Sequence, residues 1–167
     1  PELYDRAELY GEAGGSYPDN ASRFVALSRA AVEAIRLLAP DVVHVHDWQA
    51  ALVPVYLKLS PNAIGTDVRS VQTIHNLAYQ GRFWAPDLSL TGLPPEIFTP
   101  RFLEFFGDLN LLKAGILAAD AVTTVSPRYA AEILTSQFGE GLEGVLRDRE
   151  ADLHGVLNGI DTEEWNP

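Results

Sequence analysis

Four short runs rich in β-branched residues, separated by segments with helical spacing, constrain the fold of this chain more than any other feature. The runs predicted to be strands cover residues 41–47, 68–74, 121–125 and 153–157. Between them, apolar residues recur every three or four positions, as on the buried face of a helix. Strands that alternate with helices are typical of a parallel sheet covered by helices. The sequence therefore predicts an α/β, Rossmann-like fold.

The first two helical segments have recognisable ends. Asp19-Asn20 is a favourable N-cap for the first helix, and Pro40 ends this helix. Residues 48–59 are helical in composition, but Pro54 requires a kink or a late start because proline lacks the backbone N–H. Two helices are therefore expected around the first strand.

The second half of the chain contains a more regular pattern. Spacings of three and four residues link Phe102, Phe105, Leu109, Leu112, Ile116 and Ala119. This pattern predicts one amphipathic helix over 102–119. Ser126-Pro127 predicts the start of a further helix with serine as its N-cap, and residues 139–150 are expected to form a short one. Residues 1–18 and 81–100 are predicted to be loops.

Length, charge and cysteine content exclude several classes of protein. The 167 residues suffice for one domain with a core of its own. A net charge of −11 disfavours binding to nucleic acids or to anionic membranes. The absence of cysteine excludes a disulfide framework and a thiolate zinc site, and no apolar run is long enough to span a bilayer. A cytoplasmic protein is expected. Because methionine is absent and the chain starts at Pro1, we interpret it as an internal fragment of a longer polypeptide.

Polar side chains follow each predicted strand. Asp47 and Trp48 follow the first, His75 the second, Ser126 the third and Asn158 the fourth. Ligands of open α/β sheets bind at the carboxyl ends of the strands. This set of groups suits a polyhydroxylated ligand. Each residue also has a simpler interpretation, since Asp47 and Ser126 are good helix caps, Asn158-Gly159 is an ordinary turn and a tryptophan is more often a packing residue.

Two further patterns are weaker. Residues 139–144 match G-x-G-x-x-G, but they follow a helix rather than a strand and therefore lack the context of a dinucleotide site. His44, His46 and Asp47 resemble a metal cluster, yet neighbours on a strand point to opposite faces. His44 is more simply expected to be a satisfied core histidine. A metal hydrolase that uses His44, His46 and His75 is kept as an alternative.

Several segments, in their order along the chain, resemble bacterial glycogen synthases and plant starch synthases. They are Tyr17-Pro-Asp-Asn-Ala-Ser-Arg-Phe24, Asp41-Val-Val-His-Val-His-Asp-Trp-Gln-Ala50, Thr73-Ile-His-Asn-Leu-Ala-Tyr-Gln-Gly81, Leu112-Lys-Ala-Gly115, Ala119-Asp-Ala-Val-Thr-Thr-Val-Ser-Pro127, Glu140-Gly-Leu-Glu-Gly144 and Gly155-Val-Leu-Asn-Gly-Ile-Asp161. The resemblance spans essentially the whole chain, and the run from His75 to Gly81 is its most specific part.

The resemblance implies an activity and a set of site residues. The family transfers glucose from ADP-glucose to the non-reducing end of an α-1,4-glucan, with retention at the anomeric carbon and without a metal or other cofactor. By resemblance, His75 contacts the transferred glucosyl group, Asn158 hydrogen-bonds it, and Asp47 orients its hydroxyl groups. Further substrate-binding residues are expected to be Trp48, Tyr79, Gln80 and Tyr10. The expected partners are therefore ADP-glucose and maltooligosaccharides.

The resemblance also implies a domain organisation. Residues 1–167 look like most of the N-terminal, acceptor-side domain of a two-domain GT-B glycosyltransferase, with an interdomain linker that begins near 165–167. The family's Lys-x-Gly-Gly-Leu loop and its C-terminal domain, which supplies most nucleotide contacts, are absent. The isolated chain is therefore expected to hold sugar without transferring it. A non-catalytic maltooligosaccharide-binding module is the alternative of a different class.

Overall fold

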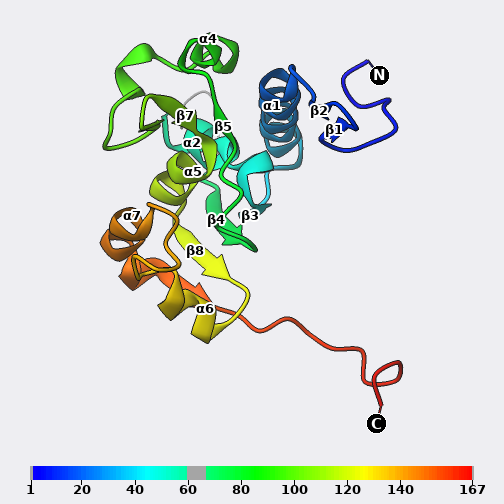
Figure 1. The fold of residues 1–167 in the computed structure, drawn as a ribbon, viewed down its shortest axis with the longest axis vertical. Coiled ribbons are helices and arrows are strands. Elements are labelled where there is room, and N and C mark those ends of the chain that lie inside the picture. Colours follow the sequence, from blue (N-terminus) through cyan, green and yellow to red (C-terminus); the bar gives the residue numbers. More distant parts are fainter. Residues whose placement is uncertain (1, 60–66, 167) are drawn as a thin grey trace.

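A four-stranded parallel sheet lies at the centre of the molecule (Figure 1). The computed structural model describes residues 2–59 and 67–166. The strands are, in their order across the sheet, Val42–His46 (β3), Arg69–Ile74 (β4), Ala121–Thr124 (β8) and Leu153–Gly155 (β9). They coincide with the four predicted runs, and the α/β class is confirmed.

The two faces of this sheet have different environments. Each strand pairs with the next parallel strand of the chain, so right-handed crossovers pass over the same face. Val45, Ile74 and Val122 are buried on that face, in clusters with residues of the helices Leu52–Leu59 (α2) and Leu111–Ala118 (α5). His44, expected to be a core residue, points to the other face and is exposed. The expectation was wrong because it required helices over both faces at this strand.

The first helix, α1, spans Asn20–Leu38 and is confirmed. Val32 and Ile35 pack with Val45 of β3 and Val53 of α2. The helix ends at Ala39, whose left-handed backbone (φ 45°) donates its N–H to the carbonyl of Ile35. Asp19 occupies the N-cap position but makes no capping hydrogen bond, since its carboxylate pairs with Arg6 at 2.6 Å instead.

The segment after β3 starts its helix late, which is one of the two outcomes expected from Pro54. A single 3-10 turn, η1, covers Trp48–Ala50, and α2 follows with Pro54 as its third residue. Proline is tolerated in a first turn because the N–H that it lacks has no partner within the helix there. The polar residues after β3 therefore lie on a short turn at the carboxyl edge of the sheet.

The predicted helix over 102–119 is wrong in its first half. Residues Glu104–Phe105 (β6) and Asp108–Asn110 (β7) form a hairpin, and Arg82–Phe83 (β5) pairs with β7 on its other side. Phe106 and Gly107 both have positive φ, 51° and 85°, as in a two-residue hairpin turn. The three- and four-residue spacing is an accident here. Phe102 lies in a turn, Phe105 and Leu109 lie on the strands of the hairpin, and Leu112 and Ile116 lie on α5.

Ser126 accepts a hydrogen bond from Tyr129 N–H at 2.9 Å and caps the helix that starts at Pro127, as predicted. Shorter elements complete the fold. They are Gly11–Glu12 (β1), Gly15–Ser16 (β2), Ala85–Asp87 (η2), Leu88–Thr91 (α4), Pro95–Ile97 (η3), Pro127–Glu132 (α6), Glu143–Asp148 (α7) and Glu150–Asp152 (η4). The segments 1–18 and 81–100, predicted as loops, thus contain short strands and turns, and the second also contains the short helix α4.

After β9 the chain runs away from the domain (Figure 1). Its last backbone bond to the sheet joins Val156 N–H to the carbonyl of Thr124 at 2.7 Å. Residues 156–166 are exposed. None of the described helices has the length and apolar character needed to cross a membrane.

Candidate functional site

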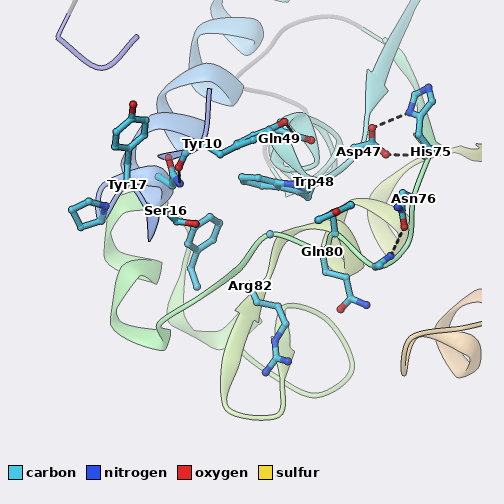
Figure 2. A pocket seen from close by; sticks show the side chains of 16 residues that line it. Tyr10, Ser16, Tyr17, Asp47, Trp48, Gln49, His75, Asn76, Gln80 and Arg82 are labelled. Carbon is cyan, nitrogen blue, oxygen red and sulfur yellow. Dashed lines mark hydrogen bonds and ion pairs between the residues drawn. The ribbon is translucent and has the colours of Figure 1, made fainter. Parts of the chain in front are cut away.

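Asp47 and His75 form a hydrogen-bonded pair at the carboxyl edge of the sheet. The parallel register pairs His46 with Thr73, so the residues just beyond each strand lie side by side. Asp47 Oδ1 accepts the backbone N–H of His75 at 2.8 Å, and Oδ2 lies 2.9 Å from its ring Nδ1 (Figure 2). This second bond orients the imidazole and leaves Nε2 free to contact a ligand. The sequence predicts that Asp47, His75 and Asn158 converge at this edge, and the first two of them lie together here.

The backbone of Asp47 is in an unusual conformation. Its φ of 53° and ψ of −164° lie near a region that is essentially restricted to glycine. Such a residue costs on the order of 1–3 kcal/mol and persists only where the surroundings hold it. The strain turns the chain sharply between β3 and η1, and it coincides with the residue whose carboxylate holds His75.

A pocket of about 910 Å³ opens beside this pair. Figure 2 shows Asp47 and His75 at one end, Trp48 across the middle, and Tyr10 and Tyr17 at the other end. The lining residues come from the N-terminal segment, from η1 and from the stretch after β4. They are Tyr10, Ser16, Tyr17, Pro18, Asn20, Asp47, Trp48, Gln49, His75, Asn76, Ala78, Tyr79, Gln80, Gly81, Arg82 and Phe83.

Trp48 forms the floor of the pocket and also belongs to an aromatic cluster. Its ring lies 4.5 Å from that of Phe24, 5.9 Å from that of Tyr10 and 5.7 Å from that of Phe83, between centroids. Gly81 (φ 62°) allows this packing, since a Cβ atom there would lie 2.5 Å from the indole. The glycine that ends the run His75–Gly81 is therefore required both by the turn and by Trp48.

Tyr10 reaches the pocket because α1 binds the N-terminal segment. Arg23, only 2% exposed, donates to the carbonyls of Leu3 at 2.6 Å and Leu9 at 2.8 Å. Asn20 Nδ2 donates to the carbonyl of Tyr10 at 2.8 Å. The hydroxyl of Tyr10 then accepts a hydrogen bond from Gln49. The motif residues Asn20 and Arg23 thus place Tyr10 over the site.

Tyr79 and Gln80 border the pocket in different ways. Tyr79 is 67% exposed and available to a ligand. Gln80 is buried, and its amide is engaged within the fold: Nε2 donates to the carbonyl of Glu140 at 3.0 Å, and Oε1 accepts from Asn110 at 2.6 Å. Its side-chain hydrogen bonds therefore hold the loop after β4 against β7 and against the segment that precedes α7.

Asn158 is not brought to the pocket. It lies in the exposed segment after β9 and is absent from the lining residues. Its contact with a sugar stays a prediction. Conversely, Gln49, Asn76, Tyr17 and Arg82 line the pocket without having been singled out as site residues. Their signal was their position beside Trp48, within or directly after the run His75–Gly81, or within the motif Tyr17–Phe24.

Two further histidine rings, those of His46 and His44, continue from His75 along the open face of the sheet. The ring of His46 lies 4.3 Å from that of His44 and 5.3 Å from that of His75, between centroids. Partial burial, and then the neighbouring charges of His44 and His75, lower the pKa of His46 below its ordinary value of 6.5. His44 Nε2 contacts Thr73 Oγ1 at 2.5 Å. Among residues 2–59 and 67–166, no three His, Asp or Glu side chains are grouped to hold a metal ion.

The pocket is nearly neutral. Among the described residues that line it, Asp47 is the one carboxylate and Arg82 the one guanidinium, and Arg82 pairs with Asp108 at 2.7 Å. The remaining polar groups are amides, hydroxyls and the His75 ring, next to tyrosine and tryptophan rings. These groups can bind paired sugar hydroxyls and stack on a pyranose face, whereas a diphosphate would need more cations.

Comparisons with known proteins agree on one family. A family model described as the starch synthase catalytic domain matches residues 1–148. Glycogen synthase 2 of Geobacter sulfurreducens is 49% identical over 170 residues, covering 99% of this chain and 35% of that protein. Glycogen synthase 1 of Rhizobium meliloti is 49% identical over 174 residues, covering 100% of this chain and 36% of that protein. The chain thus spans about a third of the length of these curated relatives.

A solved structure gives the same result for the fold. The catalytic domain of starch synthase IV from Arabidopsis thaliana, determined with ADP and acarbose bound, superposes with a TM-score of 0.84 at 37% identity. The match covers 99% of this chain and 34% of that structure. The resemblance inferred from the sequence motifs is confirmed.

Proposed function

Because this chain belongs to the family of starch synthase catalytic domains, we propose that it carries the sugar-binding side of a glucosyltransferase in glycogen or starch synthesis. The reaction transfers glucose from ADP-glucose to the non-reducing end of an α-1,4-glucan, with retention at the anomeric carbon. The observation that carries the proposal is the Asp47–His75 pair at the head of a neutral, aromatic-floored pocket. The reaction uses no metal or other cofactor and takes place in the cytoplasm.

Each residue of the pair has a distinct role in this proposal. The anomeric carbon becomes oxocarbenium-like as the bond to ADP breaks, while the acceptor hydroxyl attacks on the same face. His75 directs Nε2 toward the glucosyl group, and Asp47 orients both the imidazole and the glucose hydroxyls. Positioning of this kind contributes much of the rate, because small displacements of reacting groups slow a transfer strongly.

The other predicted substrate-binding residues contact either the acceptor glucan or the donor. Trp48 offers an aromatic surface for a pyranose ring, and the exposed Tyr79 extends it toward solvent. Tyr10 contacts the donor from the far side, with Gln49 fixing its hydroxyl. Asn158 hydrogen-bonds the glucosyl group in the complete enzyme.

A second domain supplies the charge that this pocket lacks. A leaving diphosphate needs cations to stabilise it, and Arg82 is engaged with Asp108. The relatives are about three times as long as this chain, which supports an enzyme with a separate nucleotide-binding half. The isolated chain should therefore bind maltooligosaccharides and leave ADP-glucose unreacted.

The test combines binding and transfer. Calorimetry with maltoheptaose on this chain should give saturable binding that His75→Ala weakens, and the chain should not release ADP from ADP-glucose. The polypeptide encoded by the complete reading frame should transfer glucose, and Asp47→Asn should lower kcat by about a hundredfold or more. Ser89→Ala, on the exposed surface of α4, is the matched control. Transfer that survives Asp47→Asn and His75→Ala would sink the proposal.

A glucan-binding module without catalysis is the second candidate. The observation that favours it is the single, already paired cation in the pocket. If the complete polypeptide binds maltoheptaose but transfers no glucose from ADP-glucose or UDP-glucose, this candidate replaces the first.

A further inference from the structure

The strained backbone of Asp47 is held by β4 rather than by its own strand. Its N–H donates to the carbonyl of Thr73 at 2.8 Å. Its carbonyl accepts a hydrogen bond from Gln72 Nε2 at 3.1 Å. Since a left-handed aspartate persists only where its surroundings hold it, the donors and acceptors of β4 select this conformation.

Gln72 is an unexpected residue for its position. It lies on the covered face of the sheet, is 0% exposed, and is paired in register with Val45. Of the other side chains buried on this face, Ile74 and Val122 are apolar, whereas the hydroxyl groups of Ser70 and Thr124 are hydrogen-bonded. Gln72 Oε1 has no hydrogen-bond partner, which makes the residue unfavourable for stability. A polar side chain retained there at such a cost points to a task other than packing.

The orientation of the Gln72 amide is determined by its neighbours. Nε2 faces two carbonyl oxygens, those of Asp47 and Thr73, each at 3.1 Å. A reversed amide would place Oε1 against both oxygens and repel them. Gly115 of α5 leaves room for this arrangement, because a Cβ atom there would lie 2.7 Å from Oε1. The amide therefore has one stable position, with its donor directed at Asp47.

We propose that Gln72 is a positioning residue for the transfer reaction, which holds the Asp47 backbone so that the Asp47–His75 pair faces the pocket. It acts through Asp47 and does not touch the sugar. The inference rests on the proposed function, because it assigns Gln72 a part in that reaction. The glycine of the Leu112–Gly115 motif then serves the site as well, by accommodating Gln72.

The first test uses Gln72→Met in the complete polypeptide. This change keeps the length of the side chain and removes the donor. We expect kcat to fall by about tenfold to about a hundredfold, as for a small displacement of a catalytic group, with KM changed less than about twofold. Ser70→Ala is the control: Ser70 is equally buried on β4 but bonds Asp120, away from the pocket. It should lower the unfolding midpoint and leave kcat unchanged.

The second test separates positioning from folding. Gln72→Glu introduces a carboxyl group that donates a hydrogen bond when protonated and repels the two carbonyls when ionised. The kcat of this variant, relative to that of the unchanged enzyme, should rise as pH falls, whereas the Gln72→Met ratio should stay flat. This measurement still decides the question if Gln72→Met does not fold.

Two results would overturn the inference, and they differ in their consequence for the proposed function. If Gln72→Met and Gln72→Glu keep kcat within about twofold of normal at every pH while Asp47→Asn abolishes transfer, Gln72 has no positioning role and the proposed function stands. If Asp47→Asn also leaves transfer intact, the proposed roles of the pair fail together with that of Gln72.

Discussion

Asp47 combines, at the scale of single residues, a left-handed backbone with a carboxylate that binds His75 twice. The first feature opposes stability and the second serves the site. Two substitutions that both remove the carboxylate, but differ in how well they tolerate a positive φ, can separate the backbone strain from the loss of the bonds to His75.

We expect Asp47→Gly to be more stable than Asp47→Ala by about 1 kcal/mol, because glycine adopts this backbone without strain. Urea denaturation of the chain measures the difference. Glu33→Gly and Glu33→Ala, at an exposed position within α1, are the controls. Here the alanine variant should be the more stable one, since glycine inside a helix costs about 1 kcal/mol relative to alanine. Equal stabilities at position 47 would show that the left-handed backbone is not retained without the carboxylate.

At the scale of elements, the fold depends on side chains that bond the ends of strands and helices. Asn110 caps α5, accepting from Lys113 N–H at 2.9 Å, and also donates to Gln80 at 2.6 Å. The side chain of Ser126 caps α6 and has no comparable second role among the described residues. The two capping bonds are similar, but the Asn110 side chain also bonds Gln80.

Ser126→Ala should therefore destabilise the chain by about 1 kcal/mol, the ordinary cost of a lost N-cap. Asn110→Ala should cost about 2–4 kcal/mol, because it also leaves the buried Gln80 oxygen without its donor. Thermal and urea unfolding of both variants test this difference. Indistinguishable losses would contradict a structural role for the Asn110–Gln80 bond.

The hairpin that replaced half of a predicted helix belongs to the same scale. The spacing of apolar residues from Phe102 to Ala119 is equally compatible with one helix and with strands followed by a helix. In the structure Gly107 lies in the hairpin turn and Asn110 is the N-cap of α5. The prediction failed because periodicity alone does not show which neighbours bury an apolar residue.

At the scale of the whole molecule, the sheet is covered on one face and ends in an extended segment. Residues 158–166 are exposed, and the last backbone bond to the sheet is made by Val156. The domain core therefore does not depend on the segment that carries Asn158.

Deletion of residues 158–167 should change the unfolding free energy by less than about 0.5 kcal/mol, as for surface changes that touch no packed group. Deletion from residue 153 onward, which removes β9, is the contrasting variant and should destabilise the chain strongly. Urea denaturation followed by circular dichroism measures both. A large loss in the shorter deletion would mean that the segment packs against the domain in solution.

The local sequence by itself determined the four strands, α1, the Ser126 cap and the presence of polar groups after each strand, because these features depend on spacing and on neighbouring residues. It also identified the family through contiguous motifs. The strain at Asp47, the exposure of His44, the engagement of Gln80 and the part played by Gln72 were decided only by the tertiary structure. Each of these depends on which face of the sheet is covered and on which atoms of other strands come within hydrogen-bonding distance. The order of residues along the chain contains neither kind of information.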